Sequence, residues 1–157
     1  MSREHLYSTE VEWTGDRGAG TADYCGYERA HVIRVKGKPE IFGSSDPAFL
    51  GDVSRHNPEE LLLASLSACH MLWYLHLCAE AGIVVTGYLD HAEAVMVEGG
   101  GGGQITRAVL HPVVALAGEA DAKRASTLHD EAHRRCFIAR SVNFPVEIEP
   151  VFSSRAS

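Results

Sequence analysis

Positive charge is scarce in this sequence, in which 14 Lys and Arg residues stand against 21 Asp and Glu. The formal net charge is −7. Nucleic-acid binding needs clustered basic side chains that neutralise phosphates, so this balance argues against a nucleic-acid partner. The polar residues 1–10 lack the hydrophobic core of an export signal, and we therefore expect a cytoplasmic protein.

Cysteine is also rare. The 157 residues contain four, at positions 25, 69, 78 and 136. Four cysteines are too few to form a disulfide scaffold for a chain of this length. In a reducing cytosol they are core thiols, metal ligands or catalysts, and the sequence must be searched for the context that separates these roles.

The patterns of apolar residues divide the chain into alternating strands and helices. We expect strands at 6–14, 21–36, 84–97, 104–117 and 144–152, and helices at 58–81 and about 121–141. A loop rich in Gly, Ser, Asp and Pro spans 43–57. The glycine run at 98–103 lacks the Lys and Ser or Thr that follow a phosphate loop, so it predicts a mobile hairpin tip. This order indicates an α+β protein with one domain spanning residues 1–157.

The first helix has clear boundary signals. Asn57 suits the N-cap, Pro58 the first helical position, and Glu60 completes a capping box, while Gly82 is a natural stop. The residues between are apolar almost all the way round, so the helix is either buried or membrane-spanning. Its histidines, serines and acidic start, without flanking basic anchors, favour burial and argue against a membrane partner. One short chain cannot cover such a helix on every side, so we expect a homodimer with the helix near the interface.

Cys69 lies in the middle of this helix. Taken alone it fits a core thiol better than a nucleophile, because apolar surroundings raise a thiol's pKa and leave it inert. A nucleophile needs a nearby cation. His70 points about 100° away around the helix and His76 lies two turns on, so an arginine from elsewhere is the better candidate.

Cys136 lies near the end of the second helix. The negative end of that helix disfavours a thiolate, which suits a resolving thiol better than an attacking one. An alternative is a zinc site: His129, His133 and Cys136 stand at i, i+4 and i+7 on one helix face, with His70 or Cys69 as a further ligand. A solvated or dimer-facing histidine pair explains that spacing more simply. Cys78 is expected in the core and Cys25 in a strand or turn.

The residues around the two cysteines resemble the signatures of the OsmC/Ohr family. In N-P-E-E-L-L-L-A-S-L-S-A-C-H, residues 57–70, Asn-Pro-Glu opens the helix and Cys69 follows Glu59 by ten residues (69 − 59). A-H-R-R-C-F, residues 132–137, resembles the second signature, and the cysteines are 67 residues apart (136 − 69). The opening W-T-G-D-R-G-A-G-T, residues 13–21, resembles the family's first hairpin, so the match runs from about residue 11 to 150.

The resemblance implies an OsmC-like fold, with an antiparallel sheet and a long buried central helix in an intertwined homodimer. It implies a thiol peroxidase for organic hydroperoxides, in which the Cys69 thiolate attacks the peroxide and becomes a sulfenic acid. Cys136 then condenses with it to a Cys69–Cys136 disulfide, which an external dithiol, typically lipoyl-type, reduces. No metal or organic cofactor is needed. A redox-inert or ligand-binding OsmC-like dimer is the alternative, because a fold can keep its shape without its chemistry.

The resemblance also implies a carboxylate that orients an arginine towards the attacking sulfur. Glu59 matches the carboxylate, but about 15 Å of helix separates it from Cys69, so the arginine must bridge them. Arg17 resembles the arginine of the first hairpin turn in the Ohr branch, and Arg29 and Arg55 are the other candidates. The family's pattern is broken at two positions, by His70 after the first cysteine and by Phe137 after the second.

Overall fold

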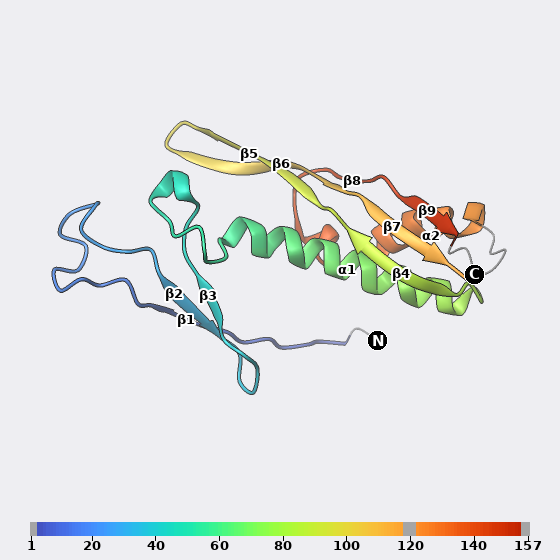
Figure 1. The fold of residues 1–157 in the computed structure, drawn as a ribbon, viewed down its shortest axis with the longest axis horizontal. Coiled ribbons are helices and arrows are strands. Elements are labelled where there is room, and N and C mark those ends of the chain that lie inside the picture. Colours follow the sequence, from blue (N-terminus) through green and yellow to red (C-terminus); the bar gives the residue numbers. More distant parts are fainter. Residues whose placement is uncertain (1–2, 118–121, 155–157) are drawn as a thin grey trace. The chain divides into compact units, whose positions relative to one another are not determined.

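The computed structural model describes residues 3–117 and 122–154, and the chain divides into two compact units, 1–61 and 62–157 (Figure 1). In the first unit, strands β1 (Glu10–Trp13), β2 (His31–Arg34) and β3 (Ile41–Gly43) form an antiparallel sheet in that order. A 3-10 turn at Pro47–Phe49 lies in the loop before the first helix.

The expected strand at 21–36 was wrong over most of its length, because only its end is β2. The residues before β2 form turns that polar side chains stabilise. The Asp16 carboxylate accepts hydrogen bonds from the backbone N–H groups of Gly18 and Gly20, and the φ angles of these glycines, 100° and 56°, are ones that other residues rarely adopt. The three-residue strand β3 was missed, since so short a segment has no usable periodicity.

Helix α1 (Pro58–Glu80) confirms the predicted boundaries. The Asn57 side-chain oxygen accepts from the Glu60 backbone N–H at 2.8 Å, and the Asn57 N–H donates to the Glu60 carboxylate at 3.1 Å. This reciprocal capping box satisfies two donors at the start of the helix. Gly82, with φ 71°, follows the end of the helix.

The second unit contains most of the sheet structure. Its strands are β4 (Val85–Asp90), β5 (Glu93–Gly99), β6 (Gly102–Leu110), β7 (Pro112–Leu116), β8 (Val146–Ile148) and β9 (Val151–Ser154). They form two three-stranded sheets, ordered β4-β7-β9 and β5-β6-β8. Helix α2 (Ala122–Arg135) and a 3-10 turn (Ala139–Ser141) connect β7 to β8.

Each of the last three expected strands is in fact two strands. At the second break, between β6 and β7, the His111 backbone N–H donates to the Asp90 carboxylate at 2.7 Å, so a side chain takes the place of a ladder partner. In the last strand, Pro150 has no N–H to donate and separates β8 from β9. The strand pairs are antiparallel except for two. The pairs β6–β8 and β7–β9 are parallel, because the chain returns through the α2 crossover.

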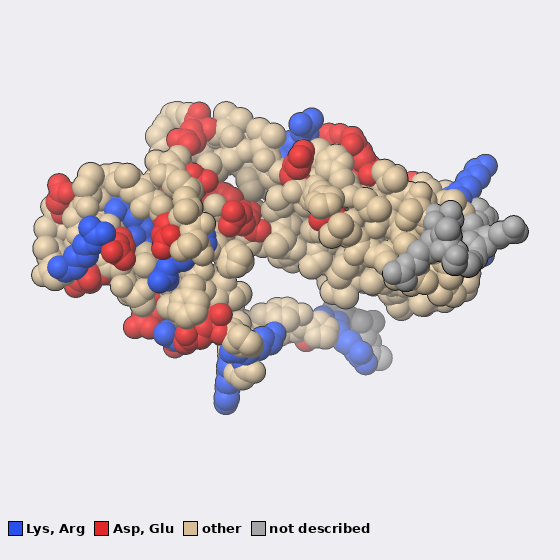
Figure 2. Space-filling view, viewed as in Figure 1, with Lys and Arg blue, Asp and Glu red and all other residues tan. Residues whose placement is uncertain are grey.

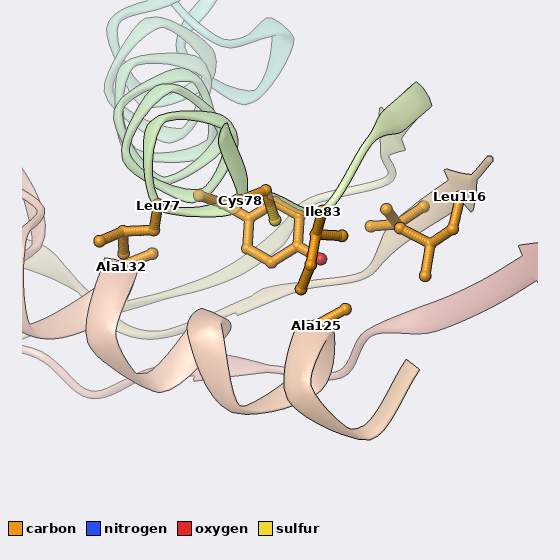
Figure 3. Packing of buried hydrophobic residues seen from close by; sticks show 8 residues of the cluster. Leu77, Cys78, Ile83, Leu116, Ala125 and Ala132 are labelled. Atoms are coloured by element: carbon orange, nitrogen blue, oxygen red, sulfur yellow. The ribbon is translucent and has the colours of Figure 1, made fainter. Parts of the chain in front are cut away.

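The core of the second unit lies between α1, α2 and the β4-β7-β9 sheet. Its fully buried members are Tyr74, Leu77, Cys78, Ile83, Val114, Leu116, Ala125 and Ala132. Figure 3 shows Ala125 and Ala132 of α2 facing Leu77, Cys78 and Ile83. Cys78 is therefore a core thiol as predicted, while Cys25 lies exposed in a turn.

One face of α1 stays uncovered by the described residues of the chain. Leu62 and Leu72 are exposed to 37% and 63%, and Ala64, Ala68 and Ala79 are exposed with them. Among the described residues, the chain therefore leaves part of the circumference of this helix uncovered. By length and composition α1 could cross a membrane, although core helices pass the same test.

Charged side chains of both signs are mixed on the face shown in Figure 2. Arg34 illustrates the pattern, since its guanidinium forms ion pairs with Glu10, Glu12 and Glu40. In such clusters the positive and negative side chains neutralise each other's charge locally.

Candidate active site

The two cysteines singled out in the sequence meet in a small apolar cluster of the second unit. Cys69 is half-buried on α1, one turn from Leu66 and one turn from Trp73, so the three share a helix face. Cys136 directly follows α2 and is fully buried. The cluster is made up of Leu63, Leu66, Cys69, Trp73, Ala108, Cys136, Ile138, Ala139, Phe144 and Val146.

The electrostatic surroundings of the two thiols differ. The pKa of Cys136 is raised to about 11, mainly by burial and also by the neighbouring Cys69 side chain. The Ala139 backbone N–H, 3.4 Å from the Cys136 sulfur, acts in the opposite direction and favours the thiolate. The thiols are free and interact directly, and Cys136 holds its proton more tightly than an ordinary cysteine.

An aromatic surface adjoins the thiols. The Trp73 ring meets the edge of Phe137 at 5.5 Å between centroids, and the Arg135 guanidinium lies 5.8 Å from the Trp73 ring centre. Phe137, directly after Cys136, is 66% exposed. A shallow hollow of about 270 Å³ opens beside Trp73 and is lined by Leu72, Trp73 and His76. This surface suits an apolar molecule better than a small polar one.

Arg17 and Glu59 both belong to the first unit. Arg17 donates two hydrogen bonds to the Glu28 carboxylate, at 2.9 and 3.2 Å, on the exposed surface. Glu59 lies half-buried in the first turn of α1. The ion pair that the structure gives Arg17 is thus with Glu28, a partner that the sequence did not suggest.

The other two arginines also lie in the first unit. Arg29 donates to the backbone oxygens of Tyr24 and Tyr27 and stacks on both rings, with its guanidinium 4.4 and 4.1 Å from their centres. Arg55 lies 3.6 Å from the Asp52 carboxylate, and its buried Nη1 has no hydrogen-bond partner among the described residues. Arg29 therefore uses its hydrogen-bond donors within its own turn, whereas the Nη1 group of Arg55 can still donate a hydrogen bond.

The histidines are placed differently from the sequence expectation. The His70 Nε2 and His129 Nδ1 atoms are 2.9 Å apart in a hydrogen bond that links α1 to α2. Both residues are buried, at 1% and 2% exposure, so the prediction of a solvated or dimer-facing His129 was wrong. The pair could have been suspected from α2, where His129 lies between Ala125 and Ala132 on the apolar face.

Burial keeps both of these histidines neutral at neutral pH. It lowers the pKa of His70 to about 4, with further lowering by His133 and a smaller opposing effect of Asp90. It also lowers the pKa of His129 to about 3, with His70 adding to the effect. In residues 3–117 and 122–154, no three His, Cys, Asp or Glu side chains are grouped to hold a metal ion. The zinc alternative therefore lacks its ligand set there.

A family model described as OsmC-like protein matches residues 51–151, about two thirds of the chain. This chain belongs to the OsmC-like protein family. Among solved structures, an OsmC-like protein of unknown function from Vibrio cholerae is 30% identical, with a TM-score of 0.85 over 94% of this chain and 100% of that chain. The recognition of the family from its cysteine signatures is confirmed, as is the α+β class.

Two further solved structures share the fold of this OsmC-like protein. An organic hydroperoxide resistance protein from Elizabethkingia anophelis is 19% identical, with a TM-score of 0.68 over 98% of this chain and 100% of that chain. OhrB of Bacillus subtilis, also an organic hydroperoxide resistance protein, is 21% identical, with a TM-score of 0.59 over 95% and 100%. Among curated proteins, none matches the sequence. The fold is thus shared with proteins named for resistance to organic hydroperoxides.

Proposed function

We propose that this OsmC-like protein is a cytoplasmic thiol peroxidase that reduces organic hydroperoxides. The Cys69 thiolate attacks the peroxide, so that an S–O bond forms, the O–O bond breaks and an alcohol leaves. Cys136 then attacks the Cys69 sulfenic acid, which forms the disulfide and releases water. An external dithiol, of lipoyl type, returns two electrons and restores both thiols.

The observation that carries the proposal is the placement of Cys69 and Cys136 in one apolar cluster, in a fold of this family. Their surroundings support the division of roles. Cys69 is half-buried and accessible, whereas Cys136 is buried and keeps its proton. The aromatic surface of Trp73 and Phe137 beside the thiols favours a hydroperoxide with an apolar body.

Two features of the proposed site, the activating cation and the subunit interface, are not among the contacts within the second unit. We assign Arg17, oriented by Glu59, as the cation that activates Cys69, with Arg55 and Arg29 as the alternatives. We also assign a second copy of the chain to the exposed apolar face of α1, because a face with Leu62 and Leu72 exposed is costly in water. The functional form is therefore a homodimer.

The test is consumption of cumene hydroperoxide with dihydrolipoamide as reductant. We expect turnover in the wild type, none above background in Cys69→Ser, and a stable sulfenic acid in Cys136→Ser by mass spectrometry. Cys25→Ser is the matched control, since Cys25 is an exposed thiol in a turn, and it should turn over like the wild type. Equal rates in wild type and Cys69→Ser would remove Cys69 as the nucleophile, and no turnover in either protein would leave a redox-inert or ligand-binding dimer as the function.

A further inference from the structure

The buried histidine pair has no part in the chemistry proposed above, yet it lies next to both cysteines in sequence. His70 directly follows Cys69 on α1. His129 precedes Cys136 by seven residues (136 − 129), about two turns of α2. The hydrogen bond between them crosses from the helix that carries one thiol to the helix that leads into the other.

The pair is held by its hydrogen bond and by a stacked neighbour. The two imidazole ring centres are 5.3 Å apart and the planes differ by 8°, so the hydrogen-bonded rings lie edge to edge in nearly one plane. One face of His129 stacks on Tyr74 of α1 at 3.8 Å and 10°, and Phe152 of β9 lies 6.0 Å away. Together these contacts fix the distance and the rotation of α2 relative to α1.

We propose that the His70–His129 hydrogen bond is a positioning device that keeps Cys136 within reach of Cys69 and thereby controls the disulfide-forming step. The inference rests on the proposed function. It concerns the condensation of the Cys69 sulfenic acid with the Cys136 thiol, in which an S–S bond forms and water leaves. The earlier attack on peroxide does not involve Cys136 and does not depend on the spacing of the two helices.

Protonation breaks this device for a simple chemical reason. The hydrogen bond needs one ring nitrogen as acceptor, and an imidazolium has none to offer. Two charged rings would also repel each other in the core. The groups that face the pair are Tyr74 on α1, His133 on α2, and Tyr88 and Asp90 on β4.

Among these groups only Asp90 carries a negative charge that could stabilise an imidazolium. Its two oxygens already accept hydrogen bonds from the Ser67 hydroxyl and the His111 backbone N–H. The remaining partners are neutral phenols and a histidine that repels a second positive charge. The lowered pKa values of His70 and His129 agree with this arrangement.

The test separates the two steps in a single turnover with cumene hydroperoxide. Trapping with dimedone measures the Cys69 sulfenic acid, and mass spectrometry of quenched samples measures the disulfide. In His129→Leu we expect disulfide formation to slow about tenfold, the equivalent of one lost hydrogen bond, with unchanged sulfenic acid formation. Exposed His91 supplies the matched control, and His91→Gln should behave like the wild type in both steps.

A second variant replaces the two imidazoles with amide side chains, which keep a hydrogen bond but do not titrate. In the double variant H70Q/H129N, the glutamine amide replaces Nε2 and the asparagine amide replaces Nδ1, so the bond is retained in both members. Its disulfide step should return close to the wild-type rate at pH 7. As the pH is lowered towards 4, the wild-type rate should fall relative to the double variant, because only the wild-type pair gains protons there.

Each result decides the proposal. An unchanged disulfide rate in folded His129→Leu, or parallel pH profiles in the wild type and the double variant, would overturn it while leaving the peroxidase intact. If His129→Leu does not fold, the comparison of pH profiles alone decides. Failure of the wild type to form any Cys69 sulfenic acid would instead overturn the proposed function, and this inference with it.

Discussion

Helices α1 and α2 each bury one face against the other helix, but their outward faces differ in composition. On α2 the outer face is charged, and Glu131 forms ion pairs with Arg134 and Arg135 there. On α1 the outer face is apolar, with Leu62 and Leu72 exposed. The helix that leads into the buried thiol therefore has the polar outer face of a surface helix, whereas the helix that carries the accessible thiol keeps an exposed apolar face.

The largest effect is expected from a charge placed on the exposed apolar face of α1. Leu72→Asp places a carboxylate on the exposed apolar face, so burying that face in a dimer would cost several kcal/mol. We expect the homodimer to become a monomer in analytical ultracentrifugation. Ser126→Asp puts the same group on the exposed face of α2 and should leave the dimer intact. A monomeric wild type would contradict the assignment of α1 as the interface.

The next effect acts where the two helices meet. Ala132 is fully buried and faces Leu77 of α1 (Figure 3). Because no space exists for a larger side chain, Ala132→Leu should lower the free energy of unfolding by about 1–3 kcal/mol in urea titrations. Ser126→Leu, on the exposed face of the same helix, serves as the control and should change stability little.

The third effect concerns the pH dependence of the helix contact. The folded-state pKa values of His70 and His129, about 4 and 3, lie below the ordinary value of 6.5. Between pH 6.5 and about 4 the unfolded chain therefore binds more protons, and stability falls as the pH is lowered through this window. The urea midpoint should fall from pH 7 to pH 4.5 in the wild type and fall less in H70Q/H129N. Equal falls in both proteins would show that other groups cause the loss.

The smallest expected effect lies on the outer face of α2. Glu131→Gln removes the carboxylate whose pKa is lowered by hydrogen bonds from Arg134 and Arg135. Exposed ion pairs contribute little to stability and are screened by salt. We expect a slight decrease in melting temperature by circular dichroism at low ionic strength, and none in high salt. A large decrease in both conditions would mean that this face of α2 is also buried in the assembly.

Helix α1 was predicted well because its signals are local, whereas α2 ends at Arg135, six residues before its expected end (141 − 135). The capping box of Asn57 and Glu60 and the stop at Gly82 define α1 within a few residues, and the structure reproduces both ends. The strands were predicted poorly, since the break at His111 depends on a distant Asp90 side chain that no local pattern reveals. Register and strand direction depend on tertiary contacts in the same way.

In the candidate site, too, local signals were predicted and tertiary contacts were missed. The signature around Cys69 and Cys136 led to both thiols, and the structure places them in one cluster. The His70–His129 bond was missed, because spacing along α2 alone grouped His129 with His133 and Cys136 on a supposed metal-binding face. Helical spacing tells which side chains share a face, but it does not tell what that face meets.

The parallel pairing of the last strands has a consequence for how the protein is made. Strands β8 and β9 join β6 and β7 through residues 38 positions apart in each case (146 − 108 and 151 − 113). Both sheets of the second unit therefore lack an edge strand until residues 146–154 have left the ribosome. Because such long-range pairing is slow, the nascent chain exposes α1 and two open sheet edges during synthesis, and it is most prone to aggregation at that stage.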